Sequence, residues 1–91
     1  MSDLIITPQP TPNPNSVKFV ASRSLTGGPT KTFYNAAAAA TDPAASRLFA
    51  IPGVTGVMLL DNFCSVNQDG SHRWEDLAPR IIAVLNDVYG R

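Results

Sequence analysis

The chain has 91 residues, of which 44% are hydrophobic and 15% charged, and this length predicts one domain, residues 1–91, with a single modest core. Seven basic and seven acidic residues give a formal net charge of +0, which provides no field to attract a nucleic acid or an anionic membrane. No apolar run approaches the ~20 residues that a membrane-spanning helix needs, so we expect neither nucleic acid nor membrane as a partner.

Three strands are expected in the first part of the chain. Leu4–Thr7 is short and β-branched, and we expect an edge strand that the following prolines end. Ser16–Ala21 alternates between an apolar and a more polar side, which is typical of a half-buried strand. Thr26–Pro29 is rich in turn residues and predicts a hairpin, with Lys31–Tyr34 as its returning strand.

The segment Thr11–Phe19 is the least ordinary part of the chain, because prolines and asparagines alternate in it just before the second strand. Each proline fixes its own φ and keeps the preceding residue out of the helical region. Asn13 and Asn15 can each close an Asx-turn with the nearby backbone. These features predict a stiff turn that leads into the strand.

A short helix is expected in the middle of the chain. Asp42 is a good N-cap and Pro43 suits the first helical position, so the helix should run from there to about Ala50. The alanine run Ala36–Ala40 is ambiguous, because alanine favours helix but brings no large side chain to anchor an isolated turn.

The remainder predicts a hairpin followed by a long helix. Val54–Leu60 is apolar, and Asp61–Asn62 links it by a tight turn to a second strand, Phe63–Asn67. From Trp74 onward, apolar residues recur at helical spacing. Because Pro79 lies five residues into this pattern, the helix either starts late or is kinked in its first turn.

The order is therefore three strands, a helix, two strands and a helix, which predicts a two-layer α+β fold. In this fold two helices cover one face of a largely antiparallel sheet.

Several segments, in this order and spacing, make the chain resemble the N-terminal domain of the Nfu/NifU-like iron–sulfur cluster scaffold proteins. The resemblance runs from Thr11 to about Tyr89, and the first of its motifs is the most specific. The matching segments are Thr11–Phe19, Asn35–Ala39, Arg47–Phe49, Ile51 with Gly53–Val54, Asn62–Phe63 and Trp74–Glu75.

The resemblance implies an α+β module that is usually fused to a second domain, which carries a Cys-x-x-Cys motif and assembles or delivers the cluster. This sequence has one cysteine and no such motif, so we expect a stand-alone domain without its own cluster site. Its implied role is a non-enzymatic, accessory or protein-interaction function, with cluster-assembly proteins or apo-client proteins as partners.

The lone cysteine, Cys64, shares a strand face with Val66 and is interpreted mainly as a small core residue. Because one thiol cannot form an internal disulfide, it indicates a reducing, cytoplasmic setting. The alternative is a small homodimeric metal-binding or thiol-redox protein that uses Cys64. A dimer could pool Cys64 and His72 from both copies only if both side chains are exposed. His72 is otherwise interpreted as a solvated loop residue without a partner for acid–base chemistry.

Neither catalytic residues nor a cofactor or metal site can be assigned from the sequence, because nucleophile, phosphate-loop and paired-carboxylate motifs are missing from it. The residues expected to contact a protein partner are Asn13, Asn15 and Lys18, extended by Arg47. Trp74 is interpreted as a core residue in preference to an exposed anchor. The sequence leaves the oligomeric state open.

Overall fold

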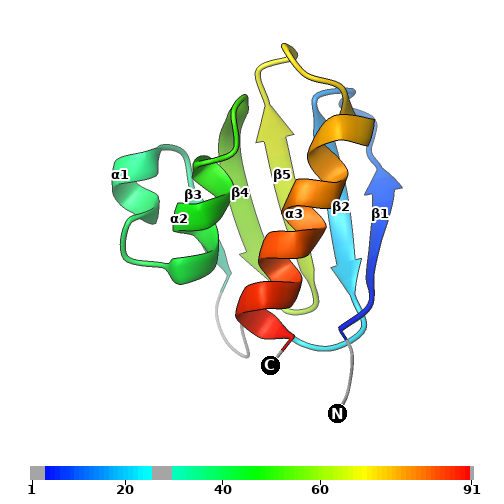
Figure 1. The fold of residues 1–91 in the computed structure, drawn as a ribbon, viewed down its shortest axis with the longest axis vertical. Helices are drawn as coiled ribbons and strands as arrows, with labels where there is room; N and C mark the ends of the chain where they lie inside the picture. The colour runs from blue at the N-terminus through cyan, green and yellow to red at the C-terminus, as the bar shows by residue number, and fades with distance from the viewer. Residues whose placement is uncertain (1–3, 26–29, 91) are drawn as a thin grey trace.

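The computed structural model describes residues 4–25 and 30–90, which form a five-stranded sheet with helices packed on it (Figure 1). The sheet order is β1-β2-β5-β4-β3, and every neighbouring pair is antiparallel. The strands are β1 (Ile6–Pro10), β2 (Ser16–Ala21), β3 (Lys31–Phe33), β4 (Val54–Leu60) and β5 (Phe63–Gln68), and the helices are α1 (Ala36–Ala39), α2 (Pro43–Phe49) and α3 (Trp74–Tyr89).

The helices α2 and α3 lie on the same face of the sheet, with α3 crossing it in front of β5 and β2 (Figure 1). Alternate strand residues point toward these helices, as the two-residue period of a strand requires. They pack with the apolar face of α3 into one buried cluster that includes Phe19, Leu59, Val66, Leu77 and Ile81. The predicted two-layer α+β fold is therefore confirmed. None of the helices in the described residues is long and apolar enough to cross a membrane.

The first strand begins and ends later than predicted. β1 runs through Pro8 to Pro10 instead of ending before them, and it lies at the edge of the sheet as expected. The Ser22 N–H donates to the Ile5 carbonyl at 2.9 Å, so by strand alternation Pro8 and Pro10 turn their nitrogens away from β2. An edge strand tolerates proline in this orientation because no ladder hydrogen bond is lost.

The predicted hairpin between Ser16–Ala21 and Lys31–Tyr34 is wrong. β3 pairs with β4 at the opposite edge of the sheet, and the segment Thr26–Pro29 lies outside the described residues. After β2 the chain bonds to the β4–β5 turn: Ala21 N–H donates to the Asn62 carbonyl at 2.7 Å, and Leu25 N–H donates to the Asp61 carbonyl. These long-range bonds lead the chain across the end of the sheet.

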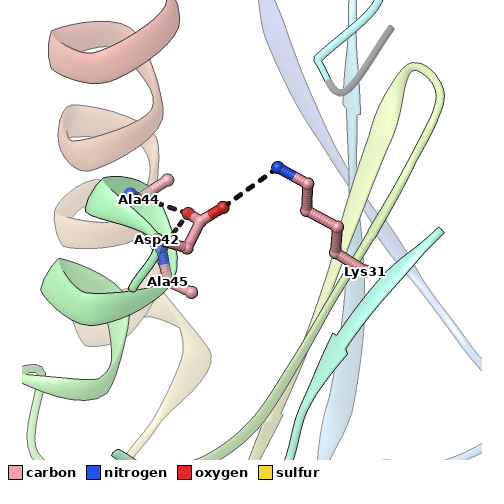
Figure 2. Close-up of polar contacts among 4 residues, drawn as sticks. All are labelled: Lys31, Asp42, Ala44 and Ala45. Atoms are coloured by element: carbon pink, nitrogen blue, oxygen red, sulfur yellow. Dashed lines mark hydrogen bonds and ion pairs between the residues drawn. The ribbon is translucent and has the colours of Figure 1, made fainter. Parts of the chain in front are cut away.

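The alanine run forms a short helix, α1, which Asn35 caps by accepting from the Ala38 N–H at 2.7 Å. α2 starts as predicted, because the Asp42 carboxylate accepts from the N–H groups of Ala44 and Ala45 at 3.0 and 2.9 Å (Figure 2). Asp42 is only 6% exposed, and its second oxygen lies 3.4 Å from Lys31 Nζ. The cap therefore also ties α2 to β3.

The long helix α3 begins at Trp74, ahead of Pro79, so the late start is ruled out. Pro79 is the sixth helical residue and removes one hydrogen bond to the first turn. Pro79 is exposed on the outer face of the helix, whereas Leu77, Ile81 and Leu85 on the opposite face are buried. The missing donor therefore lies where water can reach the freed carbonyl.

Replacing Asp42 should destabilise the whole domain through the loss of the α2 cap. We expect Asp42→Ala to lower the free energy of unfolding by about 1–2 kcal/mol, since two buried N–H groups lose their acceptor. Asp42→Asn keeps an acceptor and should lose less. Urea denaturation measures the change, with the exposed α2 substitution Ser46→Ala as a control near zero. An Asp42→Ala midpoint equal to wild type would contradict this assignment.

Candidate functional site

The turn between β1 and β2 is held by its own side chains. Asn13 Oδ1 accepts from the Asn15 N–H at 2.9 Å, which confirms the Asx-turn predicted for Asn13. The Thr11 hydroxyl lies 3.0 Å from the Asn13 carbonyl and 2.9 Å from the Ser16 carbonyl, and it also accepts from the Asn13 N–H at 3.2 Å. These bonds and the two prolines leave the turn little freedom, even though Asn13 and Asn15 are exposed.

The same turn is bonded to the segment that leads from β5 into α3. Asn15 takes part through its backbone, because its carbonyl accepts from the Gln68 N–H at 2.9 Å. The Trp74 indole Nε1–H donates to the Pro14 carbonyl, also at 2.9 Å. We call these two bonds, Asn15–Gln68 and Pro14–Trp74, the turn–helix junction. They fix the exposed asparagines relative to the first turn of α3.

Trp74 has more than the core role that its periodicity indicates. Its ring is half-buried and packs on Phe19, with ring centroids 6.4 Å apart, so packing against the core is confirmed. The bond to Pro14 spans 60 residues of sequence. No local pattern predicts it, although an indole N–H at the rim of a core usually finds an acceptor.

A polar cluster of Asp69, Ser71 and His72 lies beside the junction and was not predicted from the sequence. The Ser71 hydroxyl lies 2.5 Å from Asp69 Oδ1 and 2.7 Å from His72 Nδ1, and the Ser71 N–H donates to the same carboxylate at 2.9 Å. These bonds from Ser71 hold the pKa of Asp69 below its ordinary value. The Asp-x-Ser spacing is an Asx-turn signal that would have indicated the cluster.

This cluster differs from a nucleophilic triad in its order. Ser71 lies between the carboxylate and the imidazole, whereas a triad needs the imidazole between serine and carboxylate. Its residues instead fold the loop against Gly53, where an added Cβ would lie 2.6 Å from His72 Nδ1 and where φ is +92°. The arrangement is that of a structural loop.

Lys18 lies on the sheet face opposite the helices, because its neighbours Val17 and Phe19 point into the core. Its Nζ is 4.3 Å from the centre of the Phe63 ring, on the adjacent strand β5. This is cation–π distance, so the lysine is partly held in place. Lys18 is the third residue of β2, and its ammonium group lies over Phe63, which pairs with Val20 near the other end of the strand from the turn.

Arg47 lies apart from these residues. It pairs with Asp87 near the C-terminal end of α3, whereas the turn–helix junction is at Trp74, where α3 begins. At 1.5 Å per residue, the thirteen residues from Trp74 to Asp87 correspond to about 20 Å along the helix. The structure therefore places Asn13 and Asn15 together in the β1–β2 turn, places Lys18 on β2 with its ammonium group over Phe63, and does not bring Arg47 to them.

Cys64 is a core residue. Its side chain is 0% exposed and belongs to the buried cluster together with Val66. Burial, with a smaller contribution from the nearby Asp42 carboxylate, raises the pKa of the thiol from 9.0 to about 12. The metal or redox alternative needs an exposed Cys64, and this fold does not provide one. Within residues 4–25 and 30–90, no three His, Cys, Asp or Glu side chains are grouped to hold a metal.

Burial of Cys64 should make it inert to thiol reagents. The shift of its pKa to about 12 lowers the thiolate fraction at pH 8 about a thousandfold, and the reagent also has no access. We expect N-ethylmaleimide to modify the unfolded chain and to leave the native chain unmodified, as read by mass spectrometry. In a Cys64→Ala background, Ser65→Cys on the opposite face of β5 should react in the native state. Rapid modification of native Cys64 would refute the core assignment.

Comparison with known proteins agrees with this architecture. The family model described as "Scaffold protein Nfu/NifU N terminal" matches residues 6–91. The mitochondrial NFU1 iron–sulfur cluster scaffold homolog of Drosophila erecta is 33% identical over 87 residues, which are 94% of this chain and 31% of that protein. This chain thus spans about a third of the length of that relative.

Solved structures show the same fold. The solution structure of a NifU-like protein from Saccharomyces cerevisiae has a TM-score of 0.80 at 27% identity, covering 93% of this chain and 77% of that one. The crystal structure of protein SAV1430 from Staphylococcus aureus has a TM-score of 0.73 at 24% identity, covering 91% and 98%. Sequence and fold together place the chain in one family: it belongs to the Nfu/NifU N-terminal family of scaffold proteins.

Proposed function

We propose that residues 1–91 form a single, non-enzymatic domain that works through protein contacts in iron–sulfur cluster assembly or delivery. Family membership supports the link to scaffold proteins, and the curated relative is named for iron–sulfur cluster scaffolding. The site itself consists of hydrogen-bond donors and acceptors on a fixed turn, with one cation, Lys18, on the adjoining strand β2. Such groups bind a protein surface, and they do not make a nucleophile or a proton relay.

The observation that carries this proposal is the exposed, rigid turn around Asn13 and Asn15. Its conformation is set by the Asx-turn of Asn13 and by the turn–helix junction. A surface that is already ordered loses little conformational entropy when it binds, so the polar side chains on it are suited to recognition. Lys18 adds a positive charge on the adjacent sheet face. We propose Asn13, Asn15 and Lys18 as the main contact surface.

Arg47 forms a separate proposed contact. It is exposed and pairs with Asp87 at the far end of α3, so a partner must cover a large part of the helical layer to touch both regions. An exposed ion pair of this kind contributes little to stability, which leaves Arg47 free to exchange its partner on binding. We propose that Arg47 is used only by the larger partners.

The cluster chemistry is proposed to lie outside this domain. A cluster needs about four thiolate or imidazole ligands, and here the one thiol is buried with its pKa raised to about 12. Curated relatives are about three times as long as the matched region, so they have room for a separate cluster-binding domain. The partners of this chain would then be assembly proteins or apo-client proteins.

The buried, unpaired thiol also fits a reducing compartment, and we propose the cytoplasm. The curated relative is named as mitochondrial, which is a property of that protein. The matrix is likewise a reducing setting, so fluorescence microscopy of the tagged chain in its own cells distinguishes the two.

Removing the contact surface should abolish partner binding without unfolding the domain. We expect the double variant Asn13→Ala with Lys18→Ala to lose the recovery of purified cluster-assembly or apo-client proteins in a pull-down. The matched control, Asn62→Ala with Arg80→Ala, removes one asparagine and one cation at other exposed positions and should retain it. Arg47→Ala should weaken recovery of the larger partners only.

Two controls separate a loss of partner contact from a loss of structure. Denaturation midpoints of both double variants must lie close to wild type, since Asn13→Ala also removes the Asx-turn bond. Asn13→Asp preserves the acceptor and separates that structural role from contact. Equal recovery by wild type and the Asn13/Lys18 variant would overturn the proposed surface, and failure of the wild type to recover any such protein would overturn the proposed function.

A further inference from the structure

A groove of about 330 Å³ lies between the edge strand β1 and the first turns of α3. It is near the lower limit of small-ligand sites, enough for one long side chain and part of a neighbour. The walls are mostly apolar, with one carboxylate at the rim. The lining residues are Pro8, Gln9, Pro10, Val17, Trp74, Glu75 and Ala78.

The aromatic wall of the groove is fixed in position. Trp74 packs on Phe19 on one side, and its Nε1–H is committed to the Pro14 carbonyl. Trp74 lines the groove, and its one side-chain donor is already used. An aromatic ring carries partial negative charge on its face, which attracts a cation or a guanidinium group.

The strand wall of the groove accepts hydrogen bonds but offers few backbone donors. Because the Ile5 carbonyl bonds to the Ser22 N–H, residues 5, 7 and 9 face β2 and residues 8 and 10 face outward. Pro8 and Pro10 thus direct their carbonyls to the open edge and have no N–H. A partner strand could not form a regular ladder there.

Glu75 gives the groove its charge. Its side chain is 66% exposed, and its ion-pair partner Arg73 is 77% exposed. A pair so well solvated is weak and can be exchanged for another cation. An aromatic ring and a carboxylate therefore line an otherwise apolar groove, and the outward carbonyls of Pro8 and Pro10 lie at the sheet edge beside it. All of these polar features complement positive charge and hydrogen-bond donors.

We propose that the groove binds an arginine side chain, with an adjacent apolar residue, from an extended segment of a partner protein. The guanidinium has five donors, no acceptor and a planar face that stacks on an aromatic ring. It can lie on Trp74 and reach Glu75 or the Pro8 carbonyl, while the apolar neighbour fills the floor formed by Val17 and Ala78. This site goes beyond the proposed function, since it uses neither the two asparagines of the turn nor Lys18 or Arg47.

A direct test is an NMR titration of the ¹⁵N-labelled full chain. The probe is an acetylated and amidated peptide of leucine and proline residues with one central arginine, and the control peptide carries neutral citrulline at the same place. We expect shifts at the Trp74 indole N–H and the Ala78 amide, with binding at least threefold weaker for citrulline. Absence of shifts with the arginine peptide, or equal binding of both peptides, would overturn the proposal.

Two isosteric substitutions in the first turn of α3 test whether the peptide binds through the Glu75 carboxylate in the groove. Glu75→Gln should weaken arginine-peptide binding about threefold to fivefold, as expected for an exposed ion pair. Asp76→Asn removes the same charge from the same helix end outside the groove and should leave binding unchanged. Equal weakening by both would show a general charge effect and refute the groove. Neither measurement uses a cluster-assembly protein, so their failure is separate from failure of the proposed function.

Discussion

The two hydrogen bonds of the turn–helix junction fix the position of the β1–β2 turn, which carries the proposed contact residues Asn13 and Asn15. One joins the Asn15 carbonyl to the Gln68 N–H, and the other joins the Trp74 indole to the Pro14 carbonyl. Together they connect the β1–β2 turn to the end of β5 and the start of α3. The exposed Asn13 and Asn15 belong to this turn, and Trp74, which makes one of the two bonds, also lines the apolar groove. Both surfaces therefore depend on the same small set of backbone carbonyls.

This arrangement accounts for the proline content of the N-terminal region. Pro8 and Pro10 close the edge of the sheet to further strands, and the same residues form a wall of the groove. Pro12 and Pro14 stiffen the turn, and the Pro14 carbonyl receives the indole hydrogen bond. A sequence feature that first indicates only rigidity thus shapes an edge, a turn and a groove.

Local chemistry was sufficient to predict some parts of the fold. The Asp42–Pro43 helix start and the Asp61–Asn62 hairpin turn depend on residues close in sequence, and both are present. The place of β3 was not predictable from local chemistry, because it depends on pairing with β4, from which β3 is separated in sequence by α1 and α2. The extent of β1 was misjudged, since proline ends a central strand but is tolerated at an edge.

The candidate site likewise has some features that the sequence predicts and others that only the folded chain shows. The Asx-turn of Asn13 follows from residue type and spacing, and the burial of Cys64 follows from strand alternation. The distance between Arg47 and the turn could not be known, because it depends on how α2 and α3 are aligned. The groove and the bond from Trp74 to Pro14 arise only when β1 is packed beside α3.

Amide hydrogen exchange at the junction is the most direct test of this account. If the turn is held rigidly, the Gln68 and Ser16 N–H groups, which donate to Asn15 and Asn13, should exchange nearly as slowly as the core strands. Trp74→Phe removes the indole donor and should accelerate exchange at Gln68 before it affects the centre of β5. Exchange of these two amides at the rate of an unstructured peptide would contradict the central claim.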